Sequence, residues 1–276
     1  RVAAMSAAAF DRGVRAGARA AQAVPRQQAR ALACAPSQYA PPRSLVDAVP
    51  ALARGEVGGT VVVLHIAGSL NPPHPGHLRL VAAAAERVRT RTGAWPDAAL
   101  VALKSDARLA AKAYAEAAEL RLPYEDRWAL LAALAADLRA GGLLLPGVHL
   151  DGHWRAFRGD PAEIRRATDA HFGARGVRVF RAMGEDQAAR FGLLDDPAVL
   201  AVPRREGGLS STQVRSWLRN VADGDANGGG ADGASDVAGD AAGGGLRALQ
   251  RTYPRRVLDL LLQAAARARE TGLQAC

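Results

Sequence analysis

The sequence contains few cysteines and no long apolar run. Its two cysteines, Cys34 and Cys276, lie far apart in the chain, so they do not form the disulfide framework of a small secreted domain. No uninterrupted apolar stretch reaches the length that a membrane-spanning helix needs. These absences predict a soluble protein of a reducing compartment inside the cell, without a membrane partner.

Lysine is also rare, although the chain is strongly basic. Lys104 and Lys112 are the two lysines among 36 cationic residues, so arginine carries almost all of the net charge of +9. Aromatic residues make up 5% of the chain, and no arginine cluster interleaves with them as a strand-binding groove requires. We attribute the charge to a base-composition bias in the gene and predict no nucleic acid partner.

Two segments lack the hydrophobic pattern of a folded core. Residues 1–58 form a leader in which the first 50 residues hold seven Arg and two Asp. This composition is typical of an organellar transit peptide, and a poorly ordered extension is the alternative. Residues 223–245 are rich in Gly, Ala and Asp, which predicts a disordered insert. The rest, residues 59–222 with 246–270, is long enough for one α/β domain.

Strand-like segments alternate with helical patterns along this domain. They are residues 60–67, 98–103, 143–150, 177–182 and 198–202. This alternation predicts a Rossmann-like, doubly wound parallel sheet. Sheets of this kind bind ligands outside the carboxyl ends of the strands, at the point where the strand order reverses.

The first chemically informative segment, residues 68–77, follows the first predicted strand. It reads Gly-Ser-Leu-Asn-Pro-Pro-His-Pro-Gly-His and precedes a helix predicted over residues 78–89. Gly68 and Gly76 allow close approach of a ligand to the backbone, and the prolines hold His74 extended. His77 then lies at a helix N-terminus, where exposed amides and the helix dipole favour a phosphate. The segment predicts a polyphosphate site.

The second informative segment is a run of three N-cap-type residues before a helix predicted over residues 213–221. These residues are Ser210, Ser211 and Thr212. Arg215 lies four residues after Ser211, so it projects from the same face of the first turn and can bind phosphate oxygens in bidentate fashion. Hydroxyls, amides and a cation therefore converge on a second predicted anion site.

Together the two segments resemble the paired signatures of the nucleotidyltransferase superfamily. The doubled proline is most similar to nicotinamide and nicotinate mononucleotide adenylyltransferases, which join a pyridine mononucleotide to the adenylyl part of ATP. Residues 183–186 resemble the family's Gly-x-Asp, and residues 249–262 resemble its terminal segment of proline followed by an amphipathic helix. Leu70 departs from the family, which usually has an aromatic residue there, and we expect this to change packing rather than phosphate binding.

The resemblance implies a set of site residues and the cofactor Mg²⁺, with ATP and a pyridine mononucleotide as small-molecule substrates. The expected catalytic residues are His74, His77 and Arg215. The expected ATP-binding residues are Gly68, Ser69, Asn71, Gly184, Asp186, Ser210, Ser211 and Thr212, and the expected acceptor-binding residues are Lys104, Arg127 and Trp154. The acceptor phosphate attacks the α-phosphorus of ATP in line, so no protein nucleophile is needed.

Several of these residues have a simpler alternative role. Asp186 and Ser211 could be helix caps, Arg215 could be a solvated surface cation, and the Trp154 indole could anchor a loop in the core. A zinc site at His74 and His77 would need a third protein ligand, and no such cluster stands nearby in the sequence. The family role of Ser211 and Arg215 depends on their occurring together.

Two functional alternatives remain open at the level of sequence. One is a related transferase that moves an adenylyl or cytidylyl group to another phosphate acceptor. The other is a catalytically weak ATP-binding protein, and the presence of His74, His77 and Arg215 together argues against it. The sequence does not decide between the amide and acid forms of the mononucleotide, nor does it indicate the oligomeric state.

Overall fold

The computed structural model describes residues 39–54, 61–110, 120–145, 147–203, 208–227 and 236–274. Its strands are β1 (Val62–Gly68), β2 (Ala98–Leu103), β3 (Val148–Asp151), β4 (Arg178–Gly184) and β5 (Val199–Val202). All pair in parallel, in the order β3-β2-β1-β4-β5. The order reverses between β1 and β4, so the predicted doubly wound α/β fold is confirmed.

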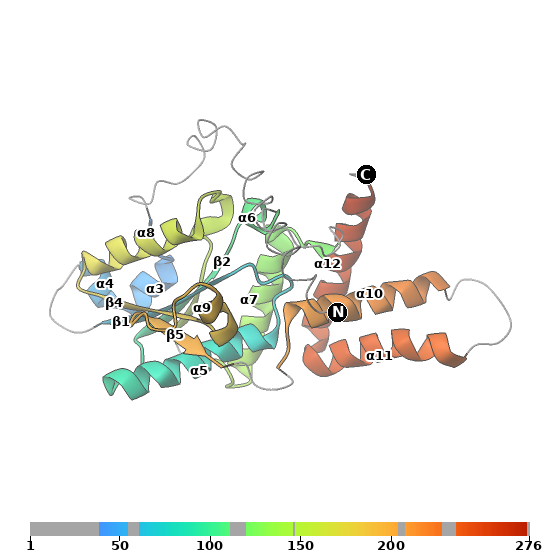
Figure 1. Ribbon diagram of the computed structural model, residues 1–276, viewed down its shortest axis with the longest axis horizontal. Coiled ribbons are helices and arrows are strands. Elements are labelled where there is room, and N and C mark those ends of the chain that lie inside the picture. Colours follow the sequence, from blue (N-terminus) through green and yellow to red (C-terminus); the bar gives the residue numbers. More distant parts are fainter. Residues whose placement is uncertain are drawn as a thin grey trace, which may run out of the picture.

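The helices connect these strands and cover both faces of the sheet (Figure 1). They are α3 (Arg43–Ala48), α4 (Pro50–Arg54), α5 (Pro75–Thr92), α6 (Asp106–Ala110), α7 (Tyr124–Ala140), the 3-10 helix η4 (His153–Ala156), α8 (Pro161–Gly173), α9 (Glu185–Arg190), α10 (Ser211–Asn227), α11 (Asp236–Thr252) and α12 (Arg255–Gln274). None of the helices in the described ranges is long and apolar enough to cross a membrane.

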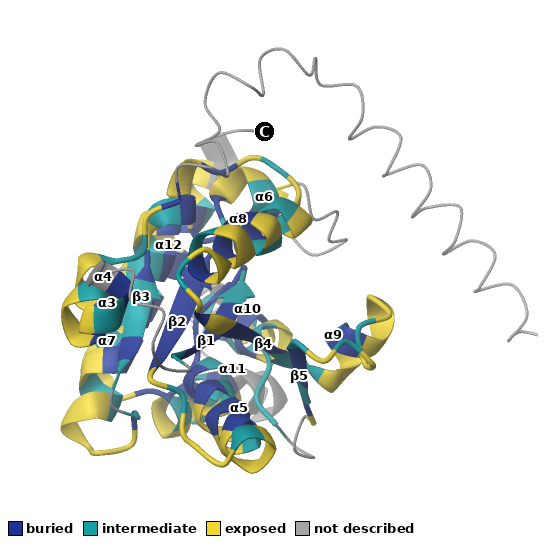
Figure 2. Cartoon of the chain, turned by 90° about the vertical axis from the view of Figure 1, so that its left-hand side faces the viewer, coloured by how far each residue is buried: buried dark blue, intermediate teal, exposed yellow. Residues whose placement is uncertain are grey.

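Successive side chains along a strand point to opposite faces of the sheet, and the core is therefore divided into two layers. In β1, Val62, Leu64 and Ile66 pack on the side of α5, α7, α10, α11 and α12. Val63 faces the other side, with buried residues of α3, α4, η4 and α8. The strands are therefore buried on both faces, as their unbroken apolar runs predict. Figure 2 shows this burial along β1 and β2.

The predicted third strand begins too early. Residues 143–147 precede β3, and the backbone N–H groups of Leu143 and Leu144 both donate to the Leu138 carbonyl at the end of α7. Gly142 and Gly147 have positive φ angles of 67° and 74°, which glycine adopts without strain. Leu143 and Leu144 therefore close the end of α7 and do not belong to β3, although their apolar side chains are typical of a strand in the sequence.

Part of the predicted leader belongs to the folded domain. Residues 39–54 contain α3 and α4, and they contribute buried Tyr39, Leu45, Val49 and Leu52 to the second layer of the core. The boundary predicted at residue 58 is therefore wrong for this stretch, because its apolar residues are spaced too sparsely among Ala and Arg to reveal burial. Residues 1–38 and 55–58 lie outside the described residues.

The predicted disorder of residues 223–245 also differs from the structure. Residues 223–227 continue α10 and residues 236–245 begin α11, while residues 228–235 lie outside the described residues. The two helices run side by side as an arm (Figure 1). At Gly245 an added Cβ would lie 2.9 Å from the Trp217 carbonyl oxygen, so this glycine allows the backbones of α11 and α10 to approach closely.

Candidate functional site

The first segment forms the turn from β1 to α5 at the reversal of strand order. Pro75 begins α5, and His74 is its N-cap with an extended backbone of φ −147° and ψ 161°, as the flanking prolines predict. An added Cβ at Gly76 would lie 2.8 Å from His74 Nδ1, so glycine allows the imidazole to rest against the helix start. The flanking prolines therefore determine the extended backbone of His74, and Gly76 leaves room for its ring.

The two histidines lie together at this helix end. Their ring centroids are 3.6 Å apart, and His77 Nδ1 accepts a hydrogen bond of 3.1 Å from the His74 backbone N–H. A neutral imidazole that accepts through Nδ1 carries its proton on Nε2. His77 is therefore held in the tautomer that can donate a hydrogen bond through Nε2, and it lies in the first turn of α5, where the helix dipole attracts anions.

The second segment forms the start of α10, as predicted. The Ser210 hydroxyl accepts from the Gln213 backbone N–H at 3.1 Å and caps the helix, whereas the Ser211 hydroxyl donates elsewhere. Arg215 donates from Nη2 to the Thr212 hydroxyl at 3.1 Å, and its side chain is 8% exposed. The alternative of Arg215 as a solvated surface cation is therefore excluded, and Ser210 rather than Ser211 is the cap.

Hydrogen bonds join the two segments directly. The Ser211 hydroxyl donates to the Pro72 carbonyl at 3.1 Å, across 139 residues of sequence. Arg215 Nη1 donates to the Asn71 carbonyl, 144 residues away. From the end of α11, the Tyr253 hydroxyl donates to the Pro73 carbonyl at 2.8 Å. The turn after β1 and the start of α10 thus form one unit with two helix N-termini.

Ser69 and Asn71 differ in how their side chains are used. The Asn71 amide donates to the Leu120 carbonyl and accepts from the Leu122 N–H, each at 3.0 Å, so it fixes the turn to the segment before α7. The Ser69 hydroxyl is buried and has no hydrogen-bond partner among the described residues. Of these two, Ser69 is therefore the side chain with a polar group available to a ligand.

Gly184 and Asp186 lie at the carboxyl end of β4, beside the turn after β1. Gly184 precedes α9, and an added Cβ there would lie 2.5 Å from Asp186 Oδ1. The glycine therefore makes room for a carboxylate that folds back over the strand end. Asp186 is exposed and lies next to the reversal of strand order; its role at a nucleotide stays a prediction.

Lys104 and Arg127 meet at the next strand end but have different environments. Lys104 follows β2, and its backbone N–H donates to the Gly68 carbonyl at 2.9 Å. Arg127 is fully buried, and its guanidinium donates to the carbonyls of Ser69, Lys104 and Leu122 at 2.6, 2.9 and 3.0 Å. It also pairs with Asp106 at 2.7 Å. We therefore assign Arg127 to positioning the loops after β1 and β2 rather than to contact with a substrate.

Trp154 is a core residue. It is 1% exposed, its indole N–H donates to Asp151 Oδ2 at 3.1 Å, and its ring stacks on Tyr39 with centroids 5.2 Å apart. No face of this indole is open to a pyridine ring, so its predicted place in the acceptor site is wrong. The alternative of an indole that anchors a loop in the core is confirmed.

Sequence reasoning missed Tyr253 and the aromatic pair Tyr124 and Trp128. Tyr253 stands immediately before Pro254, in the segment that resembles the family's terminal proline and helix, and this proximity was a usable signal. Tyr124 and Trp128 stack at 6.1 Å in the first turns of α7, and the Trp128 ring lies beside Gly152 after β3. Their helical spacing is that of ordinary core residues, so sequence gave no signal for them.

Burial and charge shift several pKa values near the sheet ends. Burial, followed by the charges of Arg181 and Lys104, lowers the pKa of His65 to about 3. Burial raises the pKa of Tyr124 to about 12 and also raises the pKa of Asp151. Among the described residues no group of three or more His, Cys, Asp or Glu could hold a metal ion.

A scan against models of known protein families found no match to this chain, and a search of curated proteins also found none. The family resemblance therefore stays a prediction that rests on the residues of the two segments.

Proposed function

We propose that the chain transfers the adenylyl group of ATP to a pyridine mononucleotide, either nicotinamide mononucleotide or nicotinate mononucleotide. The products are NAD or its deamido form, and pyrophosphate. The observation that supports this most strongly is the direct hydrogen bonding between the two segments, through Ser211 to Pro72 and Arg215 to Asn71. Two helix N-termini joined in this way are suited to a chain of phosphates.

In the proposed reaction, a phosphate oxygen of the mononucleotide attacks the α-phosphorus of ATP. The bond from the α-phosphorus to the bridging oxygen of the β-phosphate breaks, and pyrophosphate leaves with the electron pair. The attacking phosphate is ionised at neutral pH, so no general base is required. Positioning and neutralisation of charge are the contributions of the protein. Magnesium supplied with ATP would neutralise part of the negative charge on the triphosphate.

The residues at the two segments have separate proposed tasks. His77 donates from Nε2 to an oxygen of the phosphates, because its Nδ1 is occupied by the His74 backbone N–H. Arg215 supplies positive charge at the start of α10 and holds the Asn71 carbonyl at the same time. Ser69 offers a buried hydroxyl beside them. The amides at the starts of α5 and α10 complete the anion site.

The proposal is tested by measuring pyrophosphate release from ATP and magnesium with three acceptors in parallel. These are nicotinamide mononucleotide, nicotinate mononucleotide and phosphopantetheine. The full chain is used, because truncation at residue 58 would remove buried Tyr39, Leu45 and Leu52. Release with a pyridine mononucleotide, together with the matching dinucleotide, supports the proposal and identifies the acceptor.

One observation favours a second candidate, a transferase for a different phosphate acceptor. Trp154, the residue expected to stack on the pyridine ring, is buried against Tyr39. Release of pyrophosphate with phosphopantetheine alone would favour this candidate. Binding of ATP without release for any acceptor would instead favour a catalytically weak ATP-binding protein.

A further inference from the structure

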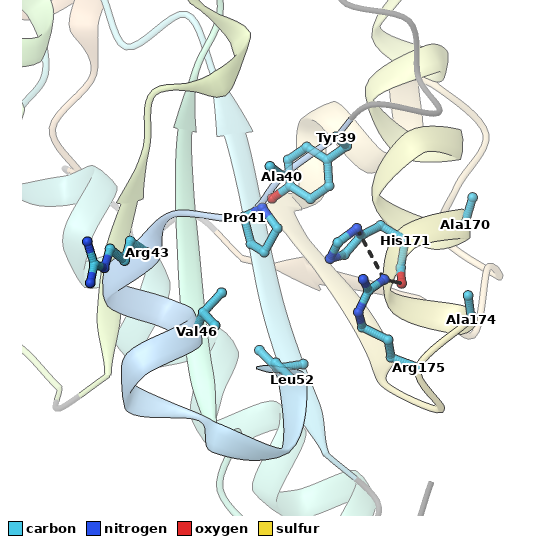
Figure 3. Close-up of a pocket in the computed structure, with 10 residues that line it drawn as sticks. All are labelled: Tyr39, Ala40, Pro41, Arg43, Val46, Leu52, Ala170, His171, Ala174 and Arg175. Atoms are coloured by element: carbon cyan, nitrogen blue, oxygen red, sulfur yellow. Dashed lines mark hydrogen bonds between the residues drawn. The ribbon is translucent and has the colours of Figure 1, made fainter. Parts of the chain in front are cut away.

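An open cavity lies on the α3 and α8 side of the sheet, whereas α5 and α10 pack on the other side. It has a volume of about 740 Å³ and lies between the segment that begins at Tyr39 and the C-terminal end of α8 (Figure 3). The described residues that line it are Tyr39, Ala40, Pro41, Arg43, Val46, Leu52, Ala170, His171, Ala174 and Arg175. The size is that of a site for a small organic molecule.

The two walls of this cavity are mainly apolar. Val46 and Leu52 project from the α3 and α4 wall, and Ala170 and Ala174 stand one turn apart at the α8 side, beyond His171 and Arg175 (Figure 3). The small alanine side chains leave the space open. A ligand that fills the cavity therefore needs an apolar body to remove this surface from water.

Two polar residues of the cavity, His171 and Arg175, lie at the C-terminal end of α8. Arg175 Nη1 donates to the His171 carbonyl at 2.9 Å and lies 3.3 Å from His171 Nδ1. The Tyr39 ring meets the His171 ring edge to face, with centroids 5.2 Å apart. Arg175 also lines the cavity, and a guanidinium can bind a carboxylate or phosphate in bidentate fashion.

The charge of the lining has one sign. None of the described lining residues is acidic, and two of them, Arg43 and Arg175, are cations. The Arg43 side chain is 93% exposed and points away from the cavity toward Asp47 at 3.8 Å (Figure 3). Arg175 is therefore the cation that faces the cavity, and a ligand with an anionic group beside its apolar body complements both features.

We propose that this cavity is a binding site for a small amphipathic organic anion. Its apolar body lies against Val46 and Leu52, and its anionic group binds Arg175. The site is separate from the joined phosphate-binding segments and does not depend on the adenylyl-transfer proposal. A ligand in it contacts both residues 39–54 and α8, so its binding stabilises the packing of the N-terminal segment.

Two matched fluorescent probes test the proposal on the full chain. The first, 8-anilinonaphthalene-1-sulfonate, is an amphipathic anion, and N-phenyl-1-naphthylamine is the same body without the sulfonate. We expect the full chain to bind the anionic probe, and Arg175→Gln to weaken this binding at least about tenfold, as expected for a lost hydrogen bond to a charged group. Binding of the neutral probe should change less than about twofold.

Matched controls separate this site from other sites on the chain. Arg166→Gln removes an arginine that is 67% exposed on the same helix and outside the cavity, and it should leave both affinities unchanged. Ala174→Trp fills the cavity from an exposed position and should abolish binding of both probes, while circular dichroism confirms folding. Excess magnesium-ATP should not displace the anionic probe.

Three results would overturn the proposal. They are an absence of probe binding to the full chain, equal binding by the Arg175→Gln and Arg166→Gln chains, and displacement of the probe by ATP. If Arg175→Gln does not fold, probe binding that persists in the folded Ala174→Trp chain would also overturn it. Pyrophosphate release by the full chain is measured separately, so failure here does not bear on the proposed transfer reaction.

Discussion

Among single residues, His77 is the one whose substitution should lower the reaction rate while leaving the fold intact. It is part of a helix start, and because its Nδ1 accepts from the His74 backbone N–H, the neutral ring carries its proton on Nε2. We expect His77→Ala to lower the rate of pyrophosphate release by roughly a hundredfold or more, as for loss of a donor that stabilises a transition state. Steady-state kinetics measure this loss, and circular dichroism checks that the fold persists.

A matched histidine provides the control for this change. His149 lies on β3, an edge strand of the sheet that β2 and β1 separate from β4. Its Nδ1 is 3.1 Å from the Ser44 hydroxyl. The His149→Ala chain should keep its rate within about threefold, because the helix-start donor is intact. A loss of less than about tenfold in His77→Ala would remove His77 from the mechanism.

His65 gives a prediction for the dependence of stability on pH. The unfolded chain protonates this imidazole below pH 6.5, whereas the folded chain does so below about pH 3. Between these values the unfolded state binds more protons, so stability falls as the pH decreases. From pH 7.5 to 4.5 this group should remove about 2 to 3 kcal/mol from the free energy of unfolding.

Urea unfolding at the two pH values measures this effect. His65→Leu replaces a buried imidazole that faces Arg181 on the neighbouring strand by an apolar group of similar size. Its free energy of unfolding should fall less between pH 7.5 and 4.5 than that of the parent chain. Equal losses in both chains would show that His65 is not the group that titrates.

The conformation of a site residue could be predicted from the sequence where its immediate neighbours determine it. The extended His74 and the serine cap of α10 follow from neighbouring prolines and from N-cap chemistry. The burial of Trp154 depends on Tyr39, more than a hundred residues away, and the role of Arg127 depends on carbonyls of two other loops. Such long-range partners leave no local pattern in the sequence.

At the scale of elements, the α10 and α11 arm offers a matched pair of glycines. A Cβ at Gly245 would lie 2.9 Å from the Trp217 carbonyl oxygen, whereas a Cβ at Gly244 would meet nothing within 4 Å. Gly245→Ala should therefore destabilise the protein by about 1 to 3 kcal/mol through overpacking. Gly244→Ala should stabilise it by up to about 1 kcal/mol, because alanine favours the helix.

Thermal unfolding followed by circular dichroism distinguishes the two glycine variants. The same change of residue, one position apart, should lower the midpoint in one chain and raise it slightly in the other. Equal shifts would mean that α11 does not pack on α10 at Trp217. Because α10 carries Ser211 and Arg215, the destabilised variant should also lose pyrophosphate release at lower temperature than the parent chain.

Element positions were predicted best where the pattern was long and its ends were marked. The strand predicted over residues 98–103 has the same bounds as β2, and the polar residues Asp97 and Lys104 flank it. The helix α5 begins earlier than predicted, at Pro75, because proline suits the first helical position. The Gly-rich end of α10 and the Gly-rich start of α11 are helical and lie side by side (Figure 1). Their composition alone does not predict this.

At the scale of the whole molecule, the N-terminal segment is expected to be required for folding. Tyr39, Leu45, Val49 and Leu52 are buried against η4 and α8. Each such side chain contributes about 1.5 to 3 kcal/mol when buried, so together they are comparable to the total stability of a domain. A chain that begins at residue 59 should therefore lack a cooperative thermal transition.

A chain that begins at residue 37 is the control for this truncation. It keeps every buried residue of α3 and α4 and should unfold cooperatively near the midpoint of the full chain. A cooperative transition at the same midpoint in the shorter chain would contradict the assignment of residues 39–54 to the core. The predicted leader boundary failed for a physical reason, since four anchoring side chains suffice to hold a segment that is otherwise rich in alanine.

Product analysis after incubation of the full chain with magnesium-ATP and each pyridine mononucleotide tests the proposed transfer reaction itself. We expect dinucleotide and pyrophosphate in equal amounts with one of the two acceptors, and little of either from the His77→Ala chain. Retained ATP binding without dinucleotide from either acceptor would contradict the proposed transfer to a pyridine mononucleotide.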